Sequence, residues 1–243
     1  DYRPDSELRR LEATNGAWTP VSPDLLEVLA MSVSIARATN GAFDPTVGPL
    51  VALWREARKT GRMPPSASIQ AAQALVGWKH LEIDRHRGAV RLAKPGMRLD
   101  LGGIAKGYIL QQALRSLRSS GLGRALVESG GDIVVGSGPP GEAGWRVDVA
   151  GASRDFRGRG EELTNAAIAT SGADAQFVEI DGLRYSHIVG PRAGLGVPHN
   201  VTARVFPDEA AVADAIATAL SVTGPQGVQD ALTAYPNLLI SLA

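Results

Sequence analysis

The 243-residue chain contains no cysteine, which excludes disulfides, a thiolate nucleophile and zinc or iron–sulfur sites with cysteine ligands. Neither sign of charge is in excess: Lys plus Arg and Asp plus Glu both total 25. Nothing therefore indicates a nucleic-acid groove or a polybasic membrane patch. No hydrophobic run approaches the roughly 20 apolar residues of a membrane helix. The length of 243 residues suggests one large domain or two intimate lobes, and the hydrophobic fraction of 44% is ordinary for a globular protein.

Helical and strand patterns alternate along the chain and predict an α+β (mixed α/β) fold, with largely antiparallel sheets and flanking helices. Ser6 and Ser22 are expected N-caps, and Asp181-Gly182 is typical of a two-residue hairpin turn. Expected helices cover 7–12, 23–38, 44–58, 69–76, 104–117 and 207–222. Expected strands cover 81–84, 89–92, 97–101, 124–128, 132–135, 145–149, 166–170, 177–180, 183–189, 201–206 and 237–242.

One glycine motif matches a nucleotide-binding pattern by its letters alone. Residues 136–141 read G-S-G-P-P-G, which satisfies the dinucleotide G-x-G-x-x-G pattern. That motif requires a helix to open at its third glycine. The segment that follows, 145–149, alternates like a strand, so we interpret residues 136–141 as a turn.

Two segments join a carboxylate to a glycine turn and an expected helix start. In N-G-A-F-D-P, Asp44 fits an N-cap with Pro45 at the first helical position, or a ligand contact. In L-D-L-G-G-I-A-K-G-Y, free N–H groups after Gly103 favour an anion site, which Lys106 could reach. Asp100 could hold a ribose or a base edge. The alternative for the second segment is a glycine turn with a solvated lysine.

Two later segments carry the remaining candidates. His187, in Y-S-H-I-V-G-P-R-A-G, lies on the opposite strand face from Ser186 and is either structural or a base. Asp214 and Thr218, in A-D-A-I-A-T-A-L, are four residues apart and share one helix face. They form either a polar stripe or a pair of oxygen ligands for magnesium.

In their order along the chain, these segments resemble the ApbE family of FAD:protein FMN transferases. The hallmarks are G-A-F-D-P-T-V-G-P-L, D-L-G-G-I-A-K-G-Y, a G-G-D strand at residues 130–132, A-T-S-G, S-H-I and A-D-A-I-A-T-A-L. They extend from Tyr2 to about Pro236. The resemblance implies a single ApbE/T-fold-like domain over residues 1–243.

The resemblance also implies a reaction and a site. Members use magnesium, cleave FAD, release AMP and attach FMN to a Thr or Ser hydroxyl of an acceptor protein. The FAD contacts carry over to Tyr2, Ala42, Phe43, Asp44, Asp100, Lys106 and Val189. The metal ligands carry over to the Gly103 carbonyl, Asp214 and Thr218. For the base that accepts the hydroxyl proton we expect His187, with Asp44 second.

This sequence departs from the family pattern at three places. Gly190 stands where the family usually has Asp, and Ala193 replaces a Thr. The family's opening strand, with its M-G-T motif, should precede Tyr2, so we expect an earlier segment with that strand and any export signal. Resemblance to exported members implies the periplasm or the outer face of the inner membrane. Two alternatives stay open: an FAD pyrophosphatase, and a flavin-binding protein with little catalysis.

Overall fold

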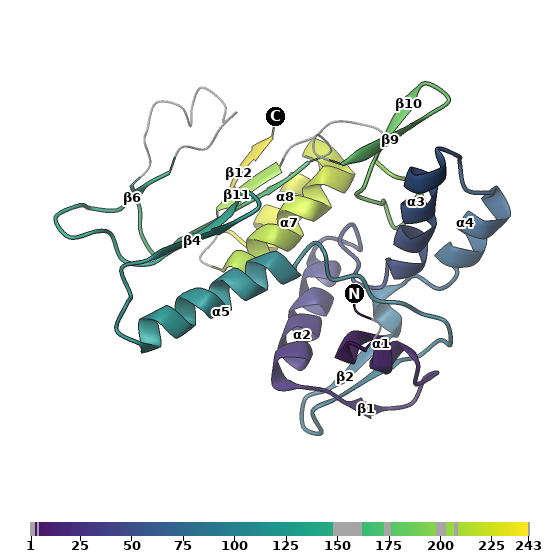
Figure 1. Ribbon diagram of the computed structural model, residues 1–243, viewed down its shortest axis with the longest axis horizontal. Coiled ribbons are helices and arrows are strands. Elements are labelled where there is room, and N and C mark those ends of the chain that lie inside the picture. Colours follow the sequence, from purple (N-terminus) through teal and green to yellow (C-terminus); the bar gives the residue numbers. More distant parts are fainter. Residues whose placement is uncertain are drawn as a thin grey trace. The chain divides into compact units, whose positions relative to one another are not determined.

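A computed structural model describes residues 3, 5–147, 162–172, 176–197, 203–206 and 209–242. The chain forms two compact units. The first unit comprises residues 1–102 and 173–200, and the second comprises residues 103–172 and 201–243. Figure 1 labels many of the elements of both units. Among the described residues, no helix combines the length and the apolar character that crossing a membrane requires.

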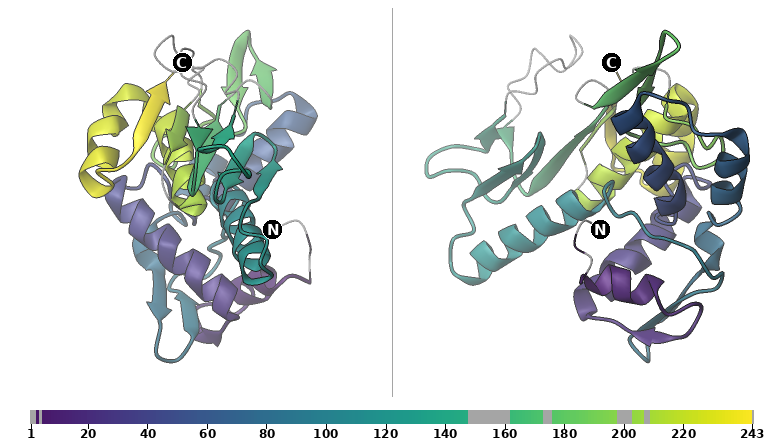
Figure 2. Two further views of the ribbon diagram at one scale, coloured as in Figure 1. Left: turned by 90° about the vertical axis from the view of Figure 1, so that its left-hand side faces the viewer. Right: turned by 45° about the vertical axis from the view of Figure 1, so that its right-hand side comes forward.

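The first unit contains four helices and two small antiparallel sheets in its described part. The helices are α1 (Glu7–Glu12), α2 (Pro23–Ala38), α3 (Gly48–Thr60) and α4 (Ser66–Gln73), with a 3₁₀ turn at Trp78–His80. One sheet has the order β1-β3-β2, from β1 (Thr19–Pro20), β2 (Leu81–Asp84) and β3 (Ala89–Leu92). The other is the hairpin of β9 (Phe177–Ile180) and β10 (Leu183–Ser186). Figure 2 shows these elements from two further directions.

Local sequence signals explain several boundaries in this unit. The hydroxyls of Ser6 and Ser22 accept hydrogen bonds from the first turns of α1 and α2, as predicted. Asp181 and Gly182 have φ values of 52° and 75°, and Leu183 pairs with Ile180. Positive φ at both central residues is the two-residue hairpin geometry that Asp-Gly favours.

The core of the first unit is built around Trp54 of α3. Its ring lies 5.1 Å from the ring of Tyr185, centroid to centroid, at a tilt of 36°. Its indole nitrogen donates to the carbonyl of Gly194 at 2.9 Å. The buried members of this cluster are Leu50, Trp54, Ala57, Ala72, Val178, Ile180, Tyr185 and Val189. The core therefore joins α3 and α4 to the hairpin that leads to His187.

The second unit is a five-stranded antiparallel sheet with helices α5 (Ala105–Ser119) and α7 (Ala210–Thr223) packed against it (Figure 1). The strand order is β12-β11-β8-β5-β4. The strands are β4 (Leu126–Ser129), β5 (Asp132–Val135), β8 (Ala166–Ser171), β11 (Ala203–Phe206) and β12 (Leu239–Leu242). The pair β6 (Trp145–Arg146) and β7 (Glu162–Leu163), a 3₁₀ turn at Gly224–Gly227 and α8 (Val228–Ala234) complete the described elements. Leu110, Leu114, Val134, Ala167 and Ala210 form a buried cluster between helices and sheet.

The mixed α+β prediction is confirmed, and three local predictions are wrong. Helix α3 begins at Gly48, not at residue 44, because Asp44 binds donors outside that helix. Residues 97–101 form only an isolated bridge between Val47 and Arg98. Helix α4 begins at Ser66, three residues earlier than predicted, directly after Pro65. Residues 136–141 lead from β5 into β6 without a helix. This confirms the prediction that they form a turn and not a dinucleotide-binding loop.

Candidate functional site

Asp44 is the centre of a buried turn in the first unit. Its Oδ1 accepts from the backbone N–H of Thr46 at 2.8 Å and from the Thr46 hydroxyl at 2.6 Å. Its Oδ2 accepts from the backbone N–H of Trp78 at 3.0 Å. Only 6% of the residue is exposed, and burial raises the pKa of Asp44 while the three donors act against that rise. The carboxylate therefore connects the G-A-F-D-P turn to the segment before β2.

The L-D-L-G-G segment lies directly beside this turn. The backbone N–H of Asp100 donates to the carbonyl of Pro45 at 2.8 Å, and Val47 pairs with Arg98. A Cβ on Gly48 would lie 2.8 Å from the carbonyl oxygen of Arg98, so this close approach needs a glycine. The structure thus brings together two segments that are more than fifty residues apart in the sequence.

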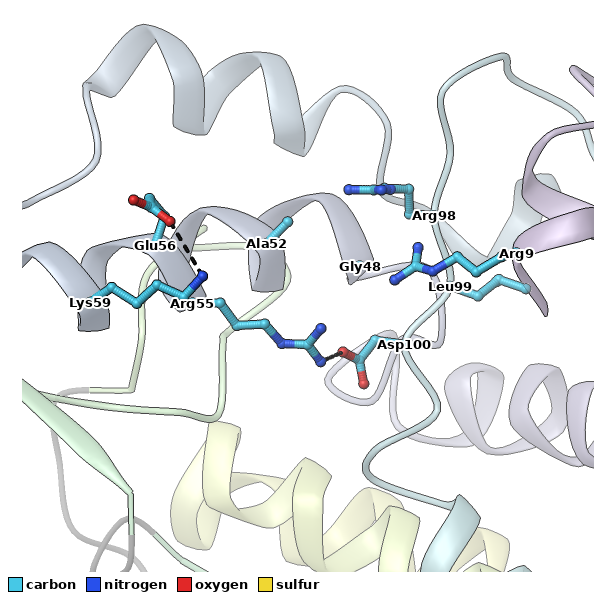
Figure 3. Close-up of a pocket in the computed structure, with 9 residues that line it drawn as sticks. All are labelled: Arg9, Gly48, Ala52, Arg55, Glu56, Lys59, Arg98, Leu99 and Asp100. Atoms are coloured by element: carbon cyan, nitrogen blue, oxygen red, sulfur yellow. Dashed lines mark hydrogen bonds and ion pairs between the residues drawn. The ribbon is translucent and has the colours of Figure 1, made fainter. Parts of the chain in front are cut away.

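Asp100 borders a polar cavity of about 210 Å³ that is lined by first-unit residues (Figure 3). Its Oδ2 accepts from Nη2 of Arg55 at 3.0 Å, and its Oδ1 accepts from the backbone N–H of Gly102 at 2.8 Å. The lining residues are Arg9, Gly48, Ala52, Arg55, Glu56, Lys59, Arg98, Leu99 and Asp100. Four are cationic and two are anionic, so the cavity suits a polar or anionic group. The sequence interpretation did not include Arg55, because nothing local links it to Asp100.

His187 follows the end of β10, with its side chain exposed, whereas Ser186 is 2% exposed. Its Nδ1 lies 3.1 Å from the carbonyl oxygen of Gln176. A carbonyl can only accept, so in this contact Nδ1 carries the proton and the lone pair of the neutral ring is on Nε2. That tautomer can accept a proton at Nε2.

The turn after His187 is tied to the Asp44 segment. The guanidinium of Arg192 donates to the carbonyl of Asn40 at 2.5 Å, and the Gln73 amide donates to the carbonyl of Arg192. Gly194 has a φ of +70°, and a Cβ there would overlap Gln73, so the turn requires glycine. Gly190, which replaces the family's usual Asp, is buried and donates to the carbonyl of Leu195 at 2.9 Å. Ala193 is exposed.

The predicted FAD contacts of the first unit are mostly buried, and two of their segments are in contact. Ala42, Phe43, Asp44 and Val189 are buried, and Asp100 lies against the Pro45 carbonyl. Tyr2 lies outside the described residues. The remaining predicted residues, Gly103, Lys106, Asp214 and Thr218, belong to the second unit.

In the second unit, glycines allow α5 and α7 to approach closely. A Cβ on Gly107 would overlap the backbone of Ala210 at the start of α7. A Cβ on Gly103 would lie 2.8 Å from Oγ1 of Thr218. Because no side chain separates the two segments here, Asp214 reaches the first turn of α5, and Thr218 lies beside Gly103, just before that helix.

Asp214 lies where α5 and α7 meet, and its carboxylate is buried there. It is 3% exposed, and its Oδ2 accepts from the backbone N–H of Gly107 at 3.1 Å, an N–H of the first turn that has no partner within the helix. Burial raises the pKa of Asp214 to about 6, although the nearby Lys106 opposes the rise. A cation at this carboxylate would remove the cost of its charge.

Asp132 is the residue that the sequence interpretation missed. It opens β5 in the quoted G-G-D strand, is 1% exposed, and accepts from Nζ of Lys106 and from the backbone N–H of Thr170. Nζ of Lys106 also lies 3.7 Å from Oδ1 of Asp214. Burial lowers the pKa of Lys106, but Asp214 and Asp132 together outweigh it and hold the pKa above its usual range. The sequence alone does not reveal that Asp132, at the start of β5, is buried against Lys106.

The second-unit residues fit a hard metal ion with oxygen ligands. Asp214 supplies a carboxylate, and Thr218 supplies a hydroxyl one helical turn later. The backbone of Gly103 lies beside that hydroxyl, so its carbonyl is the third candidate ligand. Within the described part of the chain, no three His, Cys, Asp or Glu side chains gather as a metal cluster. A metal here would therefore need further oxygens from its substrate or from water, which is how magnesium commonly binds phosphates.

Comparisons with known proteins show which family and fold this chain resembles. The chain matches the ApbE family over residues 1–240. The FAD:protein FMN transferase of Klebsiella pneumoniae (strain 342) is 33% identical, with 94% of this chain and 67% of that protein covered. The Vibrio cholerae enzyme of the same name (strain O395) is 35% identical, with 93% and 69% covered.

Solved structures extend the likeness to the fold. The flavin transferase ApbE from Vibrio cholerae has a TM-score of 0.84 and 32% identity, and the match covers 100% of this chain and 81% of that one. The Pseudomonas stutzeri flavinyl transferase ApbE in its apo form has a TM-score of 0.81 and 29% identity, with 98% and 75% covered.

Proposed function

The chain belongs to the ApbE family, and from this premise we propose that it transfers FMN from FAD to a Thr or Ser hydroxyl of an acceptor protein, with magnesium. The match over residues 1–240 carries the proposal. The acceptor oxygen forms a bond to the phosphorus of the FMN half. The bond from that phosphorus to the bridging oxygen breaks, and AMP leaves.

The first unit supplies contacts to FAD in this proposal. Phe43 and Val189 are buried residues that would shape the pocket wall, and Asp100 offers a carboxylate that Arg55 and Gly102 hold in place. Both oxygens of Asp44 already accept hydrogen bonds from the protein, so Asp44 supports the shape of the turn more readily than it accepts a proton.

His187 is the base in this proposal. Its ring is exposed, and the contact between Nδ1 and the Gln176 carbonyl holds the tautomer with a lone pair on Nε2. Nε2 would take the proton of the acceptor hydroxyl as the new phosphoester forms. An exposed position suits a group whose partner is a second protein.

The second unit supplies the metal ligands in this proposal. Asp214, Thr218 and the Gly103 carbonyl would hold magnesium, and Lys106 would contact a phosphate. When bound, magnesium neutralises charge that develops on the diphosphate oxygens as the bond breaks.

Incubation with FAD, magnesium and an acceptor peptide tests the proposal. The peptide carries a D-x-x-S/T-G-A-T-like motif, and mass spectrometry should find it enlarged by FMN, with AMP released in equal amount. AMP and free FMN with an unmodified peptide would instead establish an FAD pyrophosphatase. FAD binding without release of AMP would establish a flavin-binding protein. Chelator should abolish transfer, and a Ser/Thr→Ala peptide is the control.

A further inference from the structure

Lys106 is shared by two buried carboxylates in the second unit. Its side chain is 43% exposed, whereas those of Asp132 and Asp214 are 2% and 5% exposed. Nζ forms an ion pair with Oδ2 of Asp132 and lies 3.7 Å from Oδ1 of Asp214. Among the side chains that the structure describes, one ammonium thus faces two buried carboxylates.

Each carboxylate has one oxygen committed to the backbone. Oδ1 of Asp132 accepts from the N–H of Thr170 at 3.1 Å, which fixes it to β8. Oδ2 of Asp214 accepts from the N–H of Gly107 at 3.1 Å, which fixes it to α5. Oδ1 of Asp214 is therefore the oxygen left for a metal ion, and it is also the oxygen that faces Lys106.

We propose that Lys106 is an internal counter-ion that competes with the metal for Asp214, and that Asp132 is the positioning residue that holds the ammonium when the metal binds. In the metal-free protein the ammonium reduces the repulsion between two buried carboxylates. With a divalent ion at Asp214, Lys106 and the ion repel each other, and Asp132 retains the ammonium nearby. The inference rests on the proposed function only for the location of the metal site.

Magnesium binding to the metal-free full chain, by isothermal titration calorimetry without FAD, tests the competition. Lys106→Met should bind Mg²⁺ about 5- to 50-fold more tightly than the wild type, because a competing cation is gone. Its metal-free Tm should fall, and Mg²⁺ should raise that Tm by more than in the wild type. Lys106→Arg, which keeps the charge, should stay close to wild-type affinity.

Lys79→Met is the matched control. Lys79 is exposed and belongs to the first unit, so its Mg²⁺ affinity should equal that of the wild type. A purely structural Lys106 would lower the Tm of Lys106→Met without tightening Mg²⁺ binding. Equal or weaker binding by Lys106→Met would overturn the inference, and so would no binding by either protein at millimolar Mg²⁺.

A double-mutant cycle tests the role of Asp132. Asp132→Asn should weaken Mg²⁺ binding, because the ammonium then pairs with Asp214 alone. In the Lys106→Met background the same change should cost clearly less affinity, since no ammonium remains to be redirected. If Asp132→Asn lowers the Mg²⁺ affinity equally in both backgrounds, Asp132 acts on the metal directly, and its role as the residue that holds the ammonium is overturned. The double variant loses one charge of each sign. If Lys106→Met alone does not fold, comparing the Mg²⁺ affinity of the double variant with that of Asp132→Asn still measures the effect of removing the ammonium.

These measurements do not depend on transfer chemistry. A chain that shows the predicted Mg²⁺ affinities but transfers no FMN would refute the proposed function and leave the counter-ion role intact. If the chain transfers FMN but Lys106→Met leaves the Mg²⁺ affinity unchanged, the counter-ion role is refuted and the proposed function stands.

Discussion

Replacing Asp214 with Asn should stabilise the metal-free protein at neutral pH while it removes the proposed metal site. The side chain is almost completely buried, and burial raises its pKa from 3.8 to about 6. By linkage, ionising it in the folded state at pH 7 costs about 3 kcal/mol relative to the unfolded chain. Asn has the shape of the protonated acid and can still accept from the N–H of Gly107, so it escapes that cost.

The pH dependence identifies the cause. Because the folded pKa of Asp214 lies above its ordinary value, the stability that this group contributes is fully present below pH 3.8 and is lost as pH rises through about 6. Asp214→Asn should therefore melt about 6–12 °C above the metal-free wild type at pH 7, and the gap should close toward pH 4. Thermal unfolding in chelator, followed by circular dichroism across pH 4–8, measures this difference.

Two further measurements complete the test. Asp5→Asn is the control, because Asp5 lies on the surface in an ion pair with Arg3, and its Tm should stay close to that of the wild type. Magnesium should raise the Tm of the wild type but not that of Asp214→Asn. A lower Tm for Asp214→Asn at pH 7, or a difference that does not change with pH, would refute the reasoning.

Three other substitutions give separate tests. Asp44→Asn should lower the free energy of unfolding in urea by about 1–3 kcal/mol, because its amide nitrogen must face a donor of Thr46 or Trp78; an unchanged value contradicts this. Gly107→Ala should cost about 1–3 kcal/mol in urea unfolding and weaken Mg²⁺ binding, because the added Cβ overlaps the backbone at the start of α7; normal stability would exclude that overlap. His187→Asn should slow single-turnover AMP release at saturating FAD by about 10²–10⁴-fold with little change in FAD affinity, and a near-normal rate would move the base elsewhere.

Signals within a few residues predicted much of the fold. Ser6 and Ser22 cap their helices, and Asp181-Gly182 closes its hairpin, because each hydrogen bond or φ value lies within that short segment. The strand expected over residues 183–189 is shorter in the structure, because β10 ends at Ser186 and His187 follows it. The order of the motifs was enough to indicate the family, which the match over residues 1–240 confirms.

Only the tertiary structure decided which partners the polar residues have. Asp44 fits an N-cap by its neighbours, but a donor from residue 78 holds it in a turn, so the helix begins at Gly48. Lys106 meets Asp132, 26 residues away, and Asp214, 108 residues away, across close contacts that depend on the glycine at position 107. The sequence by itself determined the types of group and their local geometry. Long-range packing decided which charges share one buried site, because the cost of burying a charge depends on partners that are distant in the chain.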